Sequence, residues 1–229
     1  MDNSWLKSKR IIITAGPTRE SIDPVRFISN HSTGKMGFAI AEYLYRLGAN
    51  VHVVAGPVLN NFNLPDAIIT NVNTAEEMLL VTSKLAADAD VIIFSAAVSD
   101  YKVSTIATQK IKKSNSSLLI ELIPNQDIAF ELSKVKQPDQ VFIGFALETE
   151  NGLENAKAKM KRKGFDSIVL NIQNENGSGF GYDTNQIQII DSDLKVTDFA
   201  LKSKSLVAID IVDHLVKKLS SSLQSTCYV

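Results

Sequence analysis

The chain has 229 residues, with 24 Lys and Arg against 25 Asp and Glu, and 45% of its residues are hydrophobic. This composition is typical of a folded globular protein and excludes disordered, collagen-like and coiled-coil chains. A net charge of −1 creates no overall field that would attract nucleic acid or anionic lipid, so we expect neither as a partner. We expect one compact domain over residues 1–229.

The cysteine content and the lengths of the apolar runs indicate the cellular compartment in which the protein is expected. Cys227 is the single cysteine, so no disulfide can form within the chain and a disulfide-stapled secreted fold is not expected. The longest apolar runs, Val91–Val98 and Val141–Leu147, are far shorter than the roughly 18 residues of a membrane span. Residues 1–9 lack the apolar core of a signal peptide. We therefore expect a cytoplasmic protein without membrane attachment.

Short runs rich in β-branched residues alternate with stretches of helical periodicity. Such alternation predicts βαβ units, and hence an α/β protein with a three-layer, Rossmann-like fold and a mostly parallel sheet. The runs predict strands at Arg10–Thr14, Val51–Val54, Val91–Phe94, Val141–Phe145 and Ser167–Leu170.

The segments between these runs predict helices. Gly34–Leu47 carries apolar residues at helical spacing and is followed by Gly48, a common helix stop. Thr74 and Glu77 form a capping-box pattern at the start of a second helix. Three more helices are predicted at Ile128–Val135, over Leu153, Ala156 and Met160 up to Gly164, and at Leu206–Leu219. A hairpin of Gln186–Ile190 with Lys195–Thr197 predicts a sheet that is mixed at one edge.

Three long segments fit neither pattern: Gly16–Thr33, Ser95–Ser117 and Gln173–Thr184. Loops longer than about 12–15 residues are uncommon in compact domains and are usually functional. Each segment follows the carboxyl end of a predicted strand, where ligands bind open α/β sheets. We therefore expect the functional site among these three segments.

The first segment leads into a possible anion site. Ser29–Met36 resembles a phosphate-binding loop because Gly34 and Lys35 open a helix, but Ser29 replaces its first glycine and Met36 its Mg²⁺-binding hydroxyl. A loop of small polar residues that enters a helix still presents backbone N–H groups to an anion. This favours an anion site over a plain capping loop.

Other patterns are weaker. The glycines of Gly177–Gly181 have the wrong spacing for a dinucleotide fingerprint, and the strand that ends at Gly56 lacks the acidic residue that would hold a ribose. A nicotinamide-dependent oxidoreductase stays an alternative, as does a non-catalytic nucleotide-binding module. His31, His52 and His214 are too scattered for a zinc site, and the sequence identifies no metal ligands.

The second long segment carries a cluster of cations. Lys110–Lys113 places three lysines in four residues, and a solvated turn is one interpretation. The segment begins with small residues at Ser95–Ser99, which would let a ligand approach the backbone, and with Asp100, which could hold a base, a ribose or a metal. The pattern therefore favours a mobile lid over about residues 101–117 that carries lysines toward phosphates.

Together, these segments resemble the phosphopantothenoylcysteine synthetase family. The match runs from about Lys9 to Asn185, and several ordered motifs over most of a chain are far less probable by chance than one alone. The motifs that carry it are Thr14–Glu20, Ile22–Asn30 leading into Ser32–Gly37, Ala96–Tyr101, Lys110–Lys113, Gly144–Thr149 and Asp166–Asn171.

The resemblance implies a ligase that joins L-cysteine to 4′-phosphopantothenate in coenzyme A synthesis. In this family a nucleoside triphosphate, CTP in most bacterial members, activates the substrate carboxylate as an acyl-nucleotide with loss of pyrophosphate, and the cysteine amine then displaces the nucleotide. Mg²⁺ is expected with the CTP, held mainly by its phosphates. The sequence leaves the choice between CTP and ATP open.

The resemblance also implies partners. Many bacterial members fuse this activity behind a flavin-dependent decarboxylase, for which 229 residues leave no room. We therefore expect the stand-alone form, with the decarboxylase on a separate chain. Family members are typically dimers with the site near the subunit interface, so we expect a homodimer.

The resemblance assigns roles to single residues. Lys110 matches the essential lid lysine and Asn30 the asparagine that carries the acyl intermediate forward, while Arg26, Ser32 and Gly34 complete the expected substrate contacts. Gln126 and Leu147 depart from the usual Pro and Ala. The alternatives are a solvated helix face for Lys159 and Lys163 and simple core packing for Phe145. The expected nucleotide contacts are Phe94, Ser95, Ala96, Asp100, Lys110, Asn125, Asp127, Ile128, Phe145, Lys159 and Lys163.

Overall fold

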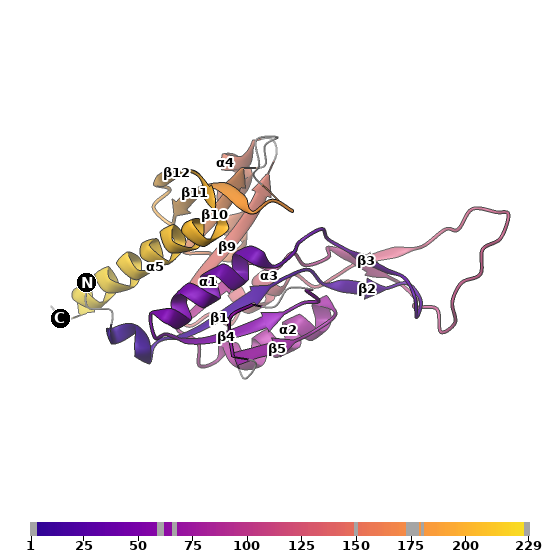
Figure 1. The fold of residues 1–229 in the computed structure, drawn as a ribbon, viewed down its shortest axis with the longest axis horizontal. Coiled ribbons are helices and arrows are strands. Elements are labelled where there is room, and N and C mark those ends of the chain that lie inside the picture. Colours follow the sequence, from indigo (N-terminus) through magenta and orange to yellow (C-terminus); the bar gives the residue numbers. More distant parts are fainter. Residues whose placement is uncertain are drawn as a thin grey trace.

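The computed structural model describes residues 4–58, 62–65, 68–148, 151–172, 179 and 181–226. Its centre is one eight-stranded sheet (Figure 1). All neighbours from β10 to β5 are parallel, whereas β11 and β12 pair antiparallel at one edge, which confirms the mostly parallel sheet with a mixed edge. In spatial order the strands are β12 (Val196–Ser203), β11 (Thr184–Asp191), β10 (Ser167–Ile172), β9 (Val141–Glu148), β6 (Val91–Phe94), β1 (Arg10–Ala15), β4 (Asn50–Ala55) and β5 (Ile69–Asn71).

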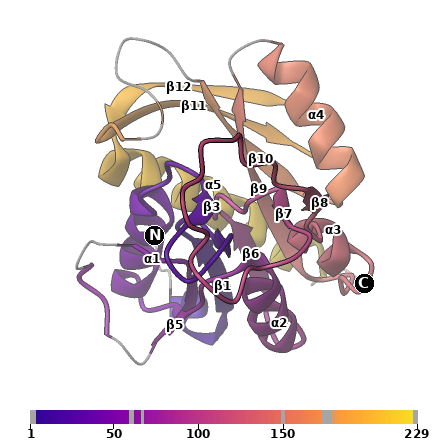
Figure 2. The same ribbon diagram turned by 90° about the vertical axis from the view of Figure 1, so that its right-hand side faces the viewer.

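Helices cover both faces of the sheet and make three layers (Figures 1 and 2). The helices α1 (Lys35–Arg46) and α5 (Lys204–Thr226) pack on one face, and α2 (Ala75–Ala86), α3 (Ile128–Ser133) and α4 (Gly152–Lys163) pack on the other. A short 3₁₀ helix, η1 (Ser4–Ser8), precedes β1. The predicted capping box is confirmed, because Thr74 accepts from the Glu77 N–H at 3.1 Å. No helix in the described ranges is long and apolar enough to cross a membrane.

The central strands read as apolar runs because they are buried on both faces. In β1, Ile11 and Ile13 belong to the core under α1 and α5, while Ile12 belongs to the core under α2, α3 and α4. α1 lies directly on this strand, since a Cβ on Gly37 would come within 2.8 Å of the Ala15 Cβ. This close packing fixes the start of α1 near the carboxyl end of β1.

The order of the strands determines where a ligand can bind. After β1 the chain forms β4 and β5 on one side of it, then crosses back to place β6 on the other side. Such a reversal opens a crevice at the carboxyl ends of the two strands on either side of it. Here those strands are β1 and β6, and the segments predicted to hold the site follow them directly.

The segments after β1 and β6, which were predicted as long functional loops, contain short strands that the prediction missed. Two antiparallel hairpins, β2 (Arg19–Ser21) with β3 (Phe27–Ser29) and β7 (Tyr101–Val103) with β8 (Leu122–Pro124), lie in and beside these segments. With the connection of residues 104–121 they form an arm that projects from the domain (Figure 1). Smaller differences are the end of α3 at Ser133 and the extension of β9 to Glu148. Most of the expected loop at residues 173–184 lies outside the described residues.

Candidate functional site

A cavity of about 450 Å³ opens at the carboxyl edge of the sheet, where the crevice is expected. Its wall combines the start of α1, the segment after β6, the start of α3 and one side of α4. All the residues predicted for the site line it except Arg26 and Lys110: they are Asn30, Ser32, Gly34, Phe94, Ser95, Ala96, Asp100, Asn125, Asp127, Ile128, Phe145, Lys159 and Lys163.

The start of α1 forms one wall. Gly34 has a φ of 76°, in the left-handed region that favours glycine, and its N–H donates to the Ser32 Oγ at 3.3 Å. A Cβ at this position would also meet the Val58 side chain at 2.9 Å. No side chain caps the helix here, so the first N–H groups of α1 are available to an anion.

Asn30 is held by the backbone after β6. Its side-chain amide donates to the carbonyl oxygens of Ala97 at 2.9 Å and Val98 at 3.1 Å. Both N–H bonds of the amide are thereby used, which fixes its orientation and leaves its oxygen to accept from a ligand in the cavity. The segments after β1 and β6 are thus joined at the wall of the cavity.

The segment after β6 is fixed by hydrogen bonds to its neighbours. The Ala96 N–H donates to the Thr14 Oγ1 at 3.3 Å, and Asn125 donates its side-chain amide to the Ser99 carbonyl at 2.9 Å. The Asn125 N–H donates to the Asp100 carbonyl at 2.8 Å, so the turn holds its position with Gln126 in place of proline. Ser99 Oγ is buried without a hydrogen-bond partner within the described part of the chain.

The aromatic residues of the wall differ in their surroundings. Phe94 is buried, and its ring lies 5.3 Å from that of Phe142 and 5.5 Å from that of Phe165. Phe145 packs partly against the core and also lines the cavity, so core packing alone does not describe it.

The lysines of α4 approach the cavity from one face of the sheet. Lys163 forms a 2.9 Å ion pair with Asp127, the residue that caps the start of α3. Burial, together with the nearby charge of Lys163, lowers the pKa of Lys159. Both lysines line the cavity, so a fully solvated helix face is the wrong interpretation for them.

Two cations on the other face were missed. Lys35 at the start of α1 and Lys204 at the start of α5 also line the cavity. Lys204 is only 8% exposed, and burial followed by the charge of Lys35 lowers its pKa. The Gly-Lys pair at the start of α1 pointed to Lys35, whereas no sequence signal marks Lys204.

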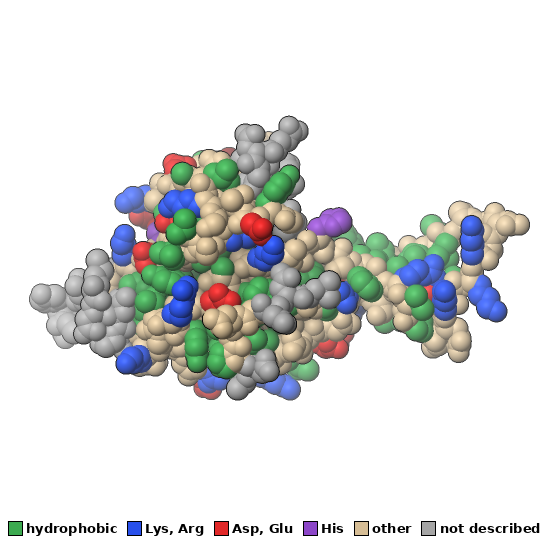
Figure 3. Space-filling model, viewed as in Figure 1, with side chains coloured by type: hydrophobic (Ala, Val, Ile, Leu, Met, Phe, Trp, Pro, Cys, Tyr) green, Lys and Arg blue, Asp and Glu red, His purple; other side chains and the backbone are tan. Residues whose placement is uncertain are grey.

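Arg26 and Lys110 lie on the arm instead of in the cavity wall. Arg26 forms an ion pair with the buried Asp23 and donates to the Ile111 carbonyl at 3.1 Å. Asp23 also accepts from the Ile111 N–H at 3.1 Å, and these bonds, led by that from Arg26, hold its pKa well below the usual range. Lys110, which precedes Ile111 in the chain, is exposed. Figure 3 shows lysine and arginine side chains along the arm.

The described residues contain no group of three or more His, Cys, Asp and Glu side chains that could hold a metal ion by themselves. Among the described residues, the carboxylates that line the cavity are those of Asp100 and Asp127, and Asp127 is already paired with Lys163. The donor set therefore suits a divalent cation only when a ligand supplies most of the oxygens.

Comparison with known proteins identifies relatives over nearly the whole chain. The family model described as the DNA/pantothenate metabolism flavoprotein C-terminal domain matches residues 6–219. The bifunctional coenzyme A biosynthesis protein CoaBC of Haemophilus influenzae is 42% identical over 95% of this chain and 54% of its own length. A crystal structure of the C-terminal domain of CoaBC has 36% identity and a TM-score of 0.79, covering 93% of this chain and 97% of that one.

A further relative has a different name. A cysteine/cysteine sulfinic acid decarboxylase from an unknown prokaryotic organism is 44% identical over 92% of this chain, which covers 59% of that protein. The chain thus spans a little more than half the length of these two curated relatives. Their names describe whole proteins, of which this chain matches one part.

Proposed function

The chain belongs to the family of the DNA/pantothenate metabolism flavoprotein C-terminal domain, the phosphopantothenoylcysteine synthetases that its motifs resemble, and from this premise we propose its reaction. The protein ligates L-cysteine to 4′-phosphopantothenate with CTP as the activating nucleotide. An oxygen of the substrate carboxylate attacks the α-phosphorus of CTP and pyrophosphate leaves. The cysteine amine then attacks the acyl carbon, CMP leaves, the amine loses a proton and an amide bond forms.

Charge neutralisation is the first requirement of this chemistry. A carboxylate resists attack because its own negative charge repels nucleophiles, and the mixed anhydride removes that charge. Bringing the carboxylate beside a triphosphate needs cations that offset the repulsion and stabilise the departing pyrophosphate. Lys159 and Lys163 support this role because both line the cavity from α4. Mg²⁺, when bound, would neutralise further phosphate oxygens, and Asp100, a carboxylate of the cavity wall, is the candidate protein ligand.

The observation that carries the proposal is the tethered amide of Asn30. Its two donor bonds to Ala97 and Val98 leave a neutral acceptor oxygen beside the cavity. Such an oxygen can orient the cysteine amine, or an N–H of the intermediate, without adding negative charge to an anionic site. A substitution that keeps the shape but changes the charge therefore tests the role directly.

The arm supports a homodimer in which Lys110 and Arg26 serve the cavity of the partner subunit. Lys110 is exposed and does not line the cavity of its own chain. The arm also exposes a row of apolar side chains, with Leu119 at 96% exposure, and such patches are typical of interaction surfaces. A two-fold pairing of arms would cover them. The exposed apolar residues are Val25, Phe27, Tyr101, Ile106, Leu118, Leu119, Leu122 and Ile123.

Pyrophosphate release tests the function. The protein is incubated with CTP, Mg²⁺, 4′-phosphopantothenate and L-cysteine, and pyrophosphate and the ligated product are quantified with ATP in a parallel reaction. We expect one pyrophosphate for each amide bond and faster turnover with CTP. Binding of CTP without pyrophosphate release would instead identify a non-catalytic nucleotide-binding module.

A further inference from the structure

Lys204 is an unusual residue for its surroundings. It begins α5, on the opposite face of the sheet from α4, and its side chain is only 8% exposed although it lines the cavity. Fully buried lysines are rare unless a counter-ion accompanies them. Within the described ranges, no carboxylate forms an ion pair with Lys204.

Among the residues that the structure describes, Lys204 finds hydrogen-bond acceptors for only part of its ammonium group. Its Nζ donates to the carbonyl oxygens of Tyr182 at 2.6 Å and Gly179 at 3.2 Å. Carbonyl oxygens satisfy protons but bring no negative charge, and an ammonium has three protons to donate. The ammonium group can therefore donate its third N–H to an anion in a hydrogen bond.

Lys35 reaches the same part of the cavity from α1. It pairs with Asp183, whose side chain is 81% exposed, and the Asp183 carbonyl accepts from the Lys204 N–H at 2.9 Å. The positive charge of Lys35 also contributes to the lowered pKa of Lys204, after burial. Lys35 and Lys204 thus lie near one carboxylate, that of Asp183. Within the described residues, one of the two positive charges is left without a negatively charged partner.

We propose that Lys35 and Lys204 form a second anion subsite in the cavity, distinct from the α4 lysines, that takes one phosphate group of a substrate. The inference rests on the proposed function for its choice of substrates. Two of them carry phosphate: the triphosphate of CTP and the phosphate ester of 4′-phosphopantothenate. The neutral amides of Asn171 and Asn185 line the same cavity and add no opposing charge.

Four variants test the subsite. Lys204→Met and Lys35→Met each remove a charge at similar side-chain length, and Lys204→Arg keeps the charge. Lys202→Met is the matched control, because Lys202 lies two residues away and pairs with Asp210 outside the cavity. Calorimetric titration of each variant with CTP and, separately, with 4′-phosphopantothenate gives two dissociation constants, and thermal melting monitors folding.

We expect Lys204→Met and Lys35→Met to weaken the same one of the two ligands by about tenfold or more, as loss of a charged hydrogen bond predicts. The other ligand should bind within about twofold of wild type, while Lys204→Arg retains most of the affinity and Lys202→Met all of it. Weaker CTP binding would assign the subsite to the triphosphate, and weaker 4′-phosphopantothenate binding would assign it to the ester.

Unchanged affinity for both ligands would overturn the inference, and so would equal weakening of both, which a merely structural lysine produces. If Lys204→Met does not fold, the same criteria apply to Lys35→Met, whose lysine is partly exposed. The proposed function fails separately, when the wild-type protein binds these ligands but releases no pyrophosphate.

Discussion

Lys163 on α4 and Asp127 at the start of α3 form an ion pair of 2.9 Å at the wall of the cavity. The same carboxylate accepts from the Phe130 N–H at 3.2 Å and so caps α3. An incoming phosphate must compete with this carboxylate for Lys163. The ion pair holds the Lys163 side chain in place before the nucleotide arrives, but it also weakens the attraction of Lys163 for the nucleotide phosphates.

Replacing Lys163 with Gln should raise the KM for CTP by about tenfold, because one charge-assisted contact to the phosphates is lost. The control is Lys161→Gln, an exposed lysine of the same helix that does not line this cavity. Steady-state pyrophosphate release over a range of CTP concentrations measures the effect. Equal KM values for Lys163→Gln and wild type would contradict the assignment.

Asn30→Asp should separate the two half-reactions. A carboxylate cannot donate to the Ala97 and Val98 carbonyls, and its negative charge faces an anionic intermediate. We expect pyrophosphate release in a single turnover to persist while amide formation falls by about 100-fold. Asn50→Asp, at an exposed position where β4 begins, serves as the control. Multiple turnover at the wild-type rate in Asn30→Asp would refute the role.

Lys110→Gln should abolish the first half-reaction, so that no pyrophosphate appears even in a single turnover. Lys84→Gln, an exposed lysine of α2, should behave as wild type.

Mixing the Lys110→Gln and Asn30→Asp proteins tests whether the arm acts across subunits. A mixed dimer would then contain one intact site, and random reassociation should restore about a quarter of the wild-type rate. An inactive mixture, with mixed dimers demonstrated by mass spectrometry, would place the arm over its own cavity.

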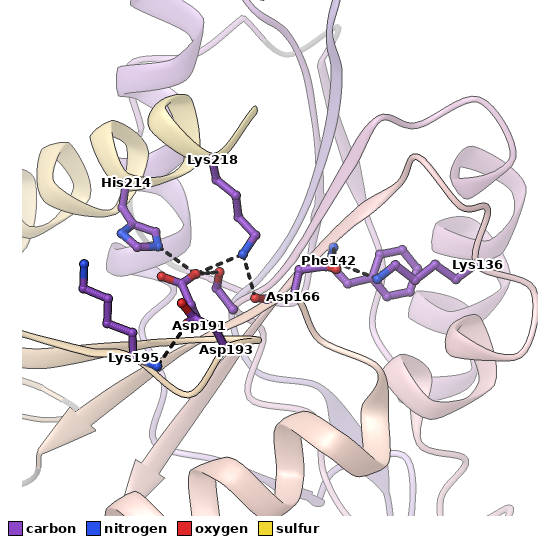
Figure 4. A network of polar contacts seen from close by, with 9 residues as sticks. Lys136, Phe142, Asp166, Asp191, Asp193, Lys195, His214 and Lys218 are labelled. Atoms are coloured by element: carbon purple, nitrogen blue, oxygen red, sulfur yellow. Dashed lines mark hydrogen bonds and ion pairs between the residues drawn. The ribbon is translucent and has the colours of Figure 1, made fainter. Parts of the chain in front are cut away.

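Asp191 pairs in register with Ser167, the first residue of β10, and so lies at the opposite end of the sheet from the cavity. Its carboxylate joins α5 to β10 and β11 (Figure 4). It accepts from Ser167 at 2.6 Å, Lys218 at 3.0 Å and His214 at 3.1 Å. Burial acts to raise its pKa, but these hydrogen bonds outweigh burial, so the pKa lies below the ordinary value. The charged carboxylate therefore stabilises the fold at neutral pH.

Asp191→Asn should lower the free energy of unfolding at pH 7 by about 2 kcal/mol. The difference from wild type should shrink as the pH falls below about 4, the ordinary pKa of an aspartate, because the carboxylate of the unfolded chain is protonated first and the native carboxylate only at its lower pKa. Urea unfolding at several pH values measures this, with the exposed Asp139→Asn as control. A difference that stays constant down to pH 2 would show that the carboxylate charge is not the cause.

The sheet and its helices could be predicted from the sequence because burial leaves a clear pattern there. Val91–Phe94 is apolar throughout since β6 is buried on both faces, and the helix that ends before Gly48 shows the spacing of a helix with one buried side. β5 was missed because a strand of three residues is too short to show a pattern.

The arm could not be predicted in the same way. Each of its strands has three residues, which is too short for an alternation of apolar and polar side chains to be recognised. A turn signal was nevertheless present in Asp23-Pro24, where the Asp23 carboxylate accepts from the N–H groups of Val25 and Arg26 at 2.8 and 2.9 Å.

Most of the cavity wall could be predicted because its residues follow strands or begin helices. Lys204 could not, since its burial depends on contacts with Gly179 and Tyr182, which precede β11 and lie more than twenty residues away. Packing between distant segments of the chain determines whether such a side chain is buried, and the neighbouring sequence does not predict it.

The attachment of the arm has a mechanical consequence. Asn30 follows β3, Asp100 precedes β7 and Asn125 follows β8, so three residues of the cavity wall stand at the root of the two hairpins. The hydrogen bond from the Ile111 N–H to Asp23 links the connection of residues 104–121 to the turn between β2 and β3. A displacement of the arm would therefore also move residues at the rim of the cavity.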